Sequence, residues 1–252
     1  MRESLLEVSA HEGARRVALG YLDQAAAAAA RLAGEAPDDA LHDFRVGMRR
    51  LRACARAYDA ILGEEVGTKL RRRLKRVASA TNPGRDAEVQ LDWVLTVGDT
   101  EGEVERHGVL WLADRLRARK SAAYEHVRQE LIEEFDKLEG RLRTGLSTYV
   151  IHHEVGKRSE GPRFGVVAAK AIERSLVELR ADLAAVETIE DEAVAHRARI
   201  HGKRLRYLLE PLRSEVEGAK TAVKTCKALQ DLLGDLNDLH NLASTVGEAL
   251  EE

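Results

Sequence analysis

The sequence predicts an all-α protein, on the basis of its composition, its helical spacing of apolar residues and an internal repeat. Charged residues make up 33% of the 252 residues, aromatic residues only 4%, and there are four prolines. Such a mixture favours long helices over packed strands. The 44% hydrophobic content is enough to bury the core of one large domain or two small ones.

Prolines and glycines divide the chain into helical segments. Pro37, followed by two aspartates, ends the first helix and caps the second. Asn82, Pro83 and Gly84 are expected to end the third helix, and Pro211 to end or kink a later one. Residues 152–165 and the polar stretch at 98–108 are predicted loops. The predicted helices span residues 4–33, 39–62, 69–81, 85 onward, 104–150 (one or two helices), 164–187, 191–213, 217–233 and 236–250.

Two cysteines, Cys54 and Cys226, are too few and too far apart for a disulfide framework or a zinc knuckle. We expect reduced thiols packed in helices. No stretch approaches the roughly 18 apolar residues that a membrane span requires, and the charged N-terminus does not resemble a signal peptide. The default expectation is a cytoplasmic protein without a membrane partner.

Positive charge is concentrated in two segments, although the net charge is −3. Residues 41–85 contain 12 Lys and Arg against four Asp and Glu, and residues 196–227 contain nine against three. The rest of the chain therefore carries a net −17. On a generic solvated surface the two signs usually intermix, so the segregation indicates two basic regions in an acidic protein.

These basic regions are copies of each other. "HDFRVGMRRLR" at 42–52 aligns with "HRARIHGKRLR" at 196–206, an offset of 154 residues. "LKRVASATNPGRD" at 74–86 aligns with "CKALQDLLGDLND" at 226–238, an offset of 152. Where the second copy reads "LQDLLGDLND", the first reads "VASATNPGRD", which lacks the Gln and the matching Gly and inserts Pro83, so the exact position of the helix break is left open. A repeat of this size predicts a duplicated bundle of about four helices per half.

Each copy forms a basic stripe beside an apolar face. At about 100° per residue, Arg45, Arg49 and Arg52 fall within about 80° of His42. The apolar arc of this helix contains Phe44, Met48, Leu51, Ala55 and Tyr58. The second copy places His196, Arg199, Lys203 and Arg206 on its stripe, with Ala198, Leu205, Leu209 and Leu212 on its apolar arc.

The chemistry of the stripes suits an extended phosphate anion. Stacked like charges cost helix stability, and arginine forks match phosphate oxygens. A protonated histidine would add a donor. For a single charge run, a solvated helix face is the ordinary explanation, but registered copies favour a binding site. A metal site at His42 or His196 would need a second ligand one turn later, but neither helix has a His or carboxylate at i+4 on the same face, and His201 is at i+5 from His196. The run "HHE" at 152–154 is predicted to lie in a loop and is not taken as a metal site.

The repeated motifs "HDFRVGMRRLR" and "HRARIHGKRLRY", together with "LQDLLGDLNDL", resemble the signatures of the CHAD domain, the conserved histidine α-helical domain. The resemblance covers nearly the whole chain. It implies two pseudo-symmetric four-helix bundles joined by linking helices, in one domain over residues 1–252. The first half would be about 1–100, the linking helices about 101–155 and the second half about 160–252.

The resemblance also implies non-enzymatic binding of inorganic polyphosphate in a central basic cavity lined by both halves, with association with polyphosphate granules and no cofactor or metal. The following helices of each half add Arg72 and Lys75, and Lys224 and Lys227. The polyphosphate-binding residues so implied are His42, Arg45, Arg49, Arg52, Arg72, Lys75, His196, Arg199, Lys203, Arg206, Lys224 and Lys227. Arg50 and Arg204 match the motif but lie about 80° from the histidine; they are expected to border the site or to pair with acids.

Two other functions compete with this interpretation. Nucleic-acid or other polyanion binding through the same residues ranks lower, because the 4% aromatic content offers little base stacking. Hydrolysis of phosphoanhydrides has no support from a catalytic motif or a metal-holding carboxylate cluster. The E-x-E-x-K signature of the CYTH triphosphatase domain, to which many CHAD domains are fused, is absent from "EGEVER" at 101–106. The expectation is a stand-alone CHAD domain.

Overall fold

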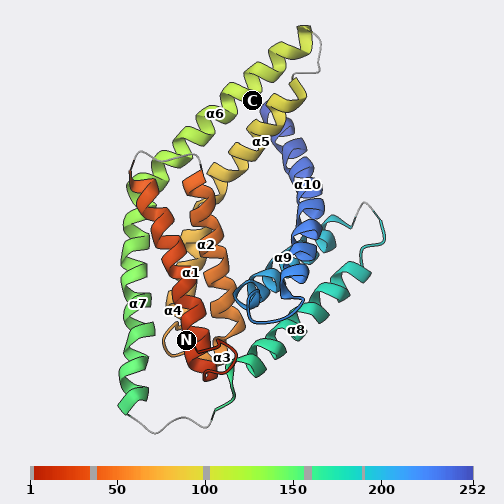
Figure 1. The fold of residues 1–252 in the computed structure, drawn as a ribbon. Coiled ribbons are helices and arrows are strands. Elements are labelled where there is room, and N and C mark those ends of the chain that lie inside the picture. Colours follow the sequence, from red (N-terminus) through yellow and green to blue (C-terminus); the bar gives the residue numbers. More distant parts are fainter. Residues whose placement is uncertain (1–2, 35–38, 99–102, 156–160, 189–190, 252) are drawn as a thin grey trace. The chain divides into compact units, whose positions relative to one another are not determined.

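The computed structural model describes residues 3–34, 39–98, 103–155, 161–188 and 191–251. Within these ranges the regular elements are helices, and extended pairing is limited to one isolated bridge, so the all-α prediction is confirmed. Figure 1 shows the ribbon. The elements are α1 (Ala10–Ala33), α2 (Asp39–Ala57), α3 (Asp59–Leu62), α4 (Thr68–Ala80), α5 (Asn82–Gly98), α6 (Glu103–His126), η1 (Val127–Leu131), α7 (Ile132–Val155), α8 (Phe164–Ala184), α9 (Glu192–Leu209), η2 (Glu210–Leu212) and α10 (Ala219–Glu251).

The chain divides into two compact units, and each takes segments from distant parts of the sequence. Unit 1 comprises Met1–Tyr21, Arg50–Thr68 and Arg143–Glu252, and unit 2 comprises Leu22–Arg49 and Lys69–Leu142. Helices α1, α2 and α7 therefore each contribute one part to unit 1 and the other to unit 2. The division into repeat halves and linking helices stays a prediction from the repeat.

In unit 2, the apolar face of α2 packs into a dry core. Phe44 and Met48 are fully buried, and the ring of Phe44 meets that of Phe135 on α7 edge-on, with centroids 4.9 Å apart. Leu74 and Val77 of α4 are also fully buried. Burial of such side chains is the main favourable contribution to folding. The predicted apolar arc of the first repeat is confirmed here.

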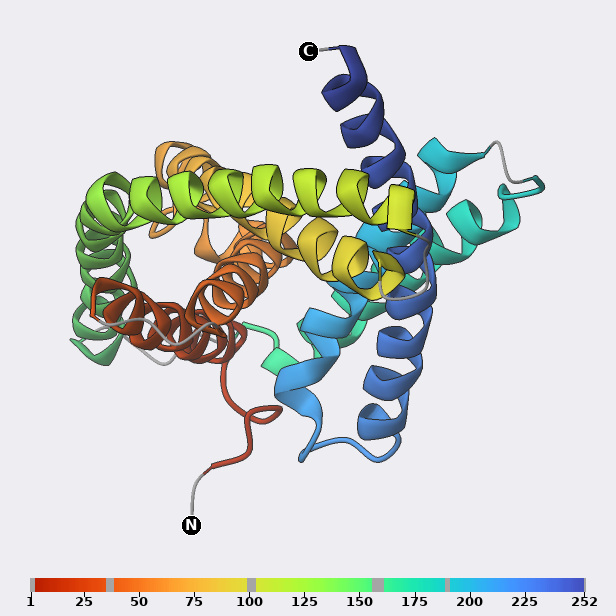
Figure 2. The same cartoon turned by 90° about the horizontal axis from the view of Figure 1, so that it is seen from above.

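Helices α5 and α6 of the same unit form a hairpin, and they lie side by side in both Figure 1 and Figure 2. The predicted helical region at 104–150 is then divided between α6 and α7. The five residues Val127–Leu131 between them form a π-helical turn, where the direction of the chain changes (Figure 1). A π-bulge of this kind is a common cause of a sharp bend in a long helix.

The alanine run of α1 allows α2 to approach closely. Ala25, Ala28 and Ala29 are buried, and a Cβ placed on Gly47 of α2 would lie 2.9 Å from the backbone N and Cα of Ala25. Real Cβ atoms do not come so near to backbone atoms. The small residues on both helices therefore set the distance between them.

Substituting Gly47→Ala is expected to lower the free energy of unfolding by about 1–3 kcal/mol, because the added methyl group pushes the two backbones apart. Gly20→Ala is the matched control. A Cβ at Gly20 meets nothing within 4 Å, so this change should stabilise the helix by about 0.5–1 kcal/mol. Urea denaturation of both variants measures the difference. Equal effects would show that α1 and α2 are not in close contact at Gly47.

In unit 1, the chain before α1 does not form the predicted helix at residues 4–9. It pairs instead with the segment that begins α8: the backbone N–H of Ala10 donates to Pro162 O at 2.9 Å, and that of Phe164 to Val8 O at 2.9 Å. The one isolated bridge joins Ser9 and Arg163. This long-range pairing satisfies backbone groups that a longer helix would have used, so α1 begins at Ala10.

The second repeat builds its core from α8, α9 and α10. Leu179, Ala198, Leu205 and Cys226 form one buried cluster. Cys54 and Cys226 are both free and buried, as predicted, and burial raises the pKa of the Cys54 thiol to about 12. Helix α9 ends at Leu209, and Pro211 lies in the short 3-10 helix η2. The predicted helix end at this proline is confirmed.

Other predicted boundaries are wrong in informative ways. The helix predicted at 39–62 is interrupted at Tyr58, which adopts φ −105° and ψ 27° between α2 and α3. Pro83, expected to end the third helix, lies in the first turn of α5. The backbone N–H that proline lacks would have no partner within the helix at this position, so its loss costs nothing. Residues 152–154, predicted as a loop, belong to the end of α7.

The two repeats differ most at the second motif. In the first copy, residues 74–86 span the break between α4 and α5. In the second copy, the corresponding residues 226–238 lie inside the continuous α10, so the predicted separation into helices at 217–233 and 236–250 is wrong. A single glycine such as Gly234 costs a helix only about 1 kcal/mol, which neighbouring contacts can offset. The proline of the first copy enforces the break.

Candidate functional site

The basic stripes lie where the sequence places them, on helices α2 and α9 with apolar faces turned into the cores. In the second copy, Ala198 and Leu205 of α9 and Leu212 of η2 are buried. In the first copy, Leu51 of α2 is buried, and so is Tyr58, the residue that follows α2. Units 1 and 2 divide the predicted residues. Unit 2 contains His42, Arg45, Arg49, Arg72 and Lys75, and unit 1 contains Arg52 with the six residues of the second copy.

Exposure differs strongly among the twelve predicted residues. One, Arg45, is buried, with 8% of its surface exposed. Those that are exposed are His42, Arg72, Lys75, His196, Lys224 and Lys227. Those that are half-buried are Arg49, Arg52, Arg199, Lys203 and Arg206. Eleven side chains thus remain at least partly accessible to a ligand.

Arg45 has a structural contact in addition to its charge. Its Nη1 donates a hydrogen bond to the carbonyl oxygen of Thr81, the single residue between α4 and α5. Thr81 is itself 1% exposed, and its hydroxyl donates to Ala78 O at 2.8 Å. Burial, with Arg49 adding to it, lowers the pKa of Arg45 to about 10, so the group stays charged at neutral pH. Arg45 therefore anchors the helix break of the first repeat.

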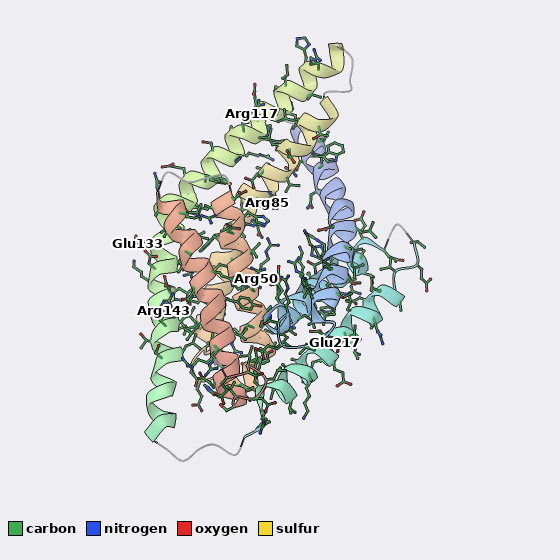
Figure 3. The ribbon with its side chains drawn as sticks, viewed as in Figure 1. Arg50, Arg85, Arg117, Glu133, Arg143 and Glu217 are labelled. Carbon is green, nitrogen blue, oxygen red and sulfur yellow. The ribbon has the colours of Figure 1, made fainter. Side chains whose placement is uncertain are left out.

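His42 lies among cations on the surface of unit 2. Burial, Arg85 and Arg49 lower its pKa below the ordinary value of 6.5, and the carboxylates of Asp43 and Glu88 oppose them. Arg85 comes from α5 (Figure 3) and donates to Glu88 Oε2 at 2.8 Å. The structure therefore brings Arg85, which the stripe argument omitted, into the same neighbourhood as His42 and Arg49.

Because neighbouring cations disfavour the protonated form of His42 and a bound polyanion would favour it, polyanion binding should be coupled to uptake of a proton at His42. Affinity is expected to rise as pH falls from neutral and to level off below the lowered pKa of the free protein. We expect about a fivefold gain between pH 8 and pH 6, reduced in His42→Gln. The exposed His126, which pairs with Glu130 on α6 and η1, provides the control His126→Gln. Equal pH profiles for all three proteins would contradict this coupling.

At the far end of the α9 stripe, one carboxylate serves two arginines. Glu210 lies 3.4 Å from Arg206 Nε and 2.6 Å from Arg50 Nε, and all three belong to unit 1. Arg50, labelled in Figure 3, also lies over the ring of Tyr21 at 5.9 Å. Tyr21 in turn donates to Tyr207 O at 2.7 Å. The expectation that Arg50 pairs with an acid is confirmed, while Arg206 presents a partly neutralised charge.

Three other cations of unit 1, Arg199, Lys224 and Lys227, form no ion pair with another described residue. Arg199 has its Nε buried without a hydrogen-bond partner among the described residues. Lys224 and Lys227 are exposed on α10, on either side of the buried Cys226. Burial raises the pKa of the Cys226 thiol, and the nearby Arg206 opposes this increase. The α9 stripe and these two lysines therefore lie on helices that pack against each other.

Sequence reasoning missed Arg56 and underrated Arg204. The pKa of the half-buried Arg204 is lowered first by burial and then by Arg56, with Arg52 adding to it, so three arginines of unit 1 are close neighbours. Arg204 could have been found from its match to the motif, but its partner Arg56 lies outside the motif. The described residues contain no group of three or more His, Cys, Asp or Glu that could hold a metal ion.

The fold and the repeated stripes define an all-helical protein with internally duplicated basic helices. Its sequence matches the family model described as "CHAD domain" over residues 16–246. The chain belongs to the CHAD domain family.

A solved structure, the crystal structure of the CHAD domain from the plant Ricinus communis, shares this fold with a TM-score of 0.77. The two sequences are 20% identical, and the match covers 98% of this chain and 81% of that one. A search of curated proteins gave no match. Within the described part of the chain, no helix has the length and apolarity needed to cross a membrane.

Proposed function

We propose that this protein binds inorganic polyphosphate, without hydrolysing it, through the basic stripes of both repeat halves. The observation that carries the proposal is that, apart from the buried Arg45, the cations of both motif helices stay at least partly accessible while the apolar faces of these helices are packed into the cores. Family membership supports it, because the resemblance to CHAD domains implies polyphosphate as the ligand. The pseudo-symmetric pair of four-helix bundles and an association with polyphosphate granules belong to the same proposal.

Physical chemistry favours a linear phosphate polymer over a compact anion. Each stripe extends roughly 15 Å along its helix at 1.5 Å per residue. From here on, Arg72 and Lys75 on α4 are counted with the first stripe, and Lys224 and Lys227 on α10 with the second. Such rows offer many hydrogen-bond donors at short spacing along the helix. A polymer that carries a charge on every unit can occupy them all, and it gains from release of its own counterions.

Isothermal titration with long-chain polyphosphate tests the proposal. Saturable binding is expected at about 0.15 M salt, with an affinity that falls steeply as salt rises. The logarithm of the affinity should fall linearly with the logarithm of the salt concentration, as for other polyanions whose counterions are released. Absence of binding at this ionic strength would refute the proposed function.

Nucleic-acid binding is the second candidate, and one observation favours it. The two tryptophans of the chain, Trp93 and Trp111, are 42% and 51% exposed, and Arg115 lies 5.8 Å from the ring centroid of Trp111. Exposed aromatic rings beside cations can stack on bases. Single-stranded DNA should then quench tryptophan fluorescence and displace polyphosphate at equal phosphate concentration. Polyphosphate binding at the stripes predicts little quenching and little displacement.

Catalysis is tested separately. Incubation of the protein with polyphosphate and Mg²⁺ is expected to release no phosphate above that of a protein-free sample. Release that saturates with substrate would replace the proposed binding function with a hydrolytic one.

A further inference from the structure

Unit 1 contains a small basic hollow that lies outside the repeated stripes. The hollow has a volume of about 150 Å³ and is formed by the last turn of α2 together with α8 and α9. Arg56, Arg174 and Arg204 each line it, one from each helix. Small side chains, including those of Ala57 and Ala171, also line the hollow and leave space in it. Neither Arg56 nor Arg174 occupies a position of the repeated motif.

The hollow is lined by three arginines and one carboxylate, and two of the arginines, Arg56 and Arg204, repel each other. Burial and the charge of Arg56 both lower the pKa of Arg204. Glu178 is the single carboxylate lining the hollow, and it also lies 3.7 Å from His201 Nε2. No ion pair of Arg56, Arg174 or Arg204 is formed within the described part of the chain. An anion entering the hollow would relieve this repulsion, and guanidinium forks fit phosphate oxygens well.

The hollow adjoins a larger cavity of about 790 Å³, and the two share Arg56, Ala57, Ala171 and Arg174 as lining residues. The larger cavity is lined by carboxylates as well as cations. Asp59, Glu64 and Glu65 line it together with Lys170, and Glu65 Oε1 lies 2.9 Å from His11 Nε2. Carboxylates accept hydrogen bonds from hydroxyl or amino groups and repel phosphates.

We propose that these adjoining cavities together form a second ligand site, for a small phosphate monoester whose other end carries hydroxyl or amino groups. The phosphate occupies the arginine hollow, and the donors of the ligand body face Glu64 and the His11–Glu65 pair. The combined space is in the range that small-molecule sites occupy. A polyphosphate chain does not fit this pattern, because its charge continues along its whole length and would meet the carboxylates of the larger cavity.

Calorimetric titration with glucose 6-phosphate, inorganic phosphate and glucose separates the contributions of the two ends. Glucose 6-phosphate is expected to bind with saturation, at least tenfold more tightly than inorganic phosphate and far more tightly than glucose. The double variant Arg56→Ala with Arg174→Ala should lose at least tenfold in affinity. Both side chains are exposed, so the fold should tolerate the change. Arg72→Ala with Lys224→Ala, which removes two cations of the stripes, is the matched control and should change the affinity less than twofold.

Ala171→Leu provides a variant that keeps every charge. The larger side chain projects from a residue that lines both cavities, so it reduces the space available to a ligand. It should weaken glucose 6-phosphate at least tenfold and leave polyphosphate binding unchanged. The proposal fails if no phosphate monoester binds with saturation. It fails equally if inorganic phosphate binds as tightly as glucose 6-phosphate, or if the stripe variant loses as much affinity as the arginine variant. Polyphosphate binding can be present or absent in each of these cases, so the two functions are tested independently.

Discussion

Exchanging Arg72 and Lys224 together for glutamate is expected to lower the affinity for polyphosphate by about 100-fold at 0.15 M salt. The two residues occupy corresponding positions of the repeats, on α4 and α10, and both are exposed. Each exchange removes an attraction and adds a repulsion, and a loss of about 100-fold corresponds to roughly 1.4 kcal/mol for each of the two sites. Titration calorimetry on folded protein measures the change directly.

The control for this result exchanges two cations outside the stripes. Arg141 on α7 and Arg180 on α8 are exposed and lie outside the repeated positions. Arg141→Glu with Arg180→Glu makes the net charge more negative by the same amount. Long-range repulsion alone should cost this variant only a few-fold in affinity, because charges beyond about 8 Å are screened at physiological salt. A loss equal to that of the stripe variant would show that net charge, and not a defined site, controls binding.

Replacing Arg45 by methionine is expected to destabilise the protein by about 2–3 kcal/mol, since the buried carbonyl oxygen of Thr81 loses a charged hydrogen-bond donor. Methionine keeps the aliphatic length and removes the charge. Thermal and urea unfolding measure the loss. Arg49→Met, at a half-buried position of the same helix, is the comparison and should cost much less stability while also weakening polyphosphate binding.

This contrast affects how any substitution in the stripe is interpreted. A variant of Arg45 loses affinity both through charge and through displacement of the α4–α5 junction, so its binding defect cannot be assigned to ligand contact alone. If Arg45→Met unfolded at the same temperature and urea concentration as the wild type, the anchoring role would be refuted.

Helical faces were the features most completely predicted from the sequence. The apolar arcs around Phe44 and Leu205 are buried, and the adjoining arcs carry the cations of the stripes, because helical periodicity alone decides which residues share a face. The end of α9 near Pro211 was also predicted, since a proline acts through local sterics. Signals of this kind need no knowledge of the partner segment.

Features that depend on distant segments were not predicted. The pairing of Ser9 with Arg163 shortens α1, and no local pattern in the first ten residues indicates it. Arg45 was grouped with the accessible cations, because a helical wheel cannot show that Thr81 O lies within its reach. Glu210 neutralises part of the charge of two arginines: Arg206, which lies one helical turn before it, and Arg50, which is distant in the sequence. Long-range partners, more than propensities, thus decide which charges remain available.

The proposed function depends most on the joint action of both stripes on one polyphosphate chain. Titration with triphosphate and with chains of about 15, 60 and 130 phosphates tests this directly, because a second engagement on the same chain raises the overall affinity without new contacts. We predict weak binding of triphosphate, a steep gain in affinity with chain length, and a gain that is largely lost in the Arg72→Glu, Lys224→Glu variant. An affinity per phosphate that is independent of chain length, unchanged in that variant, would contradict the proposed function.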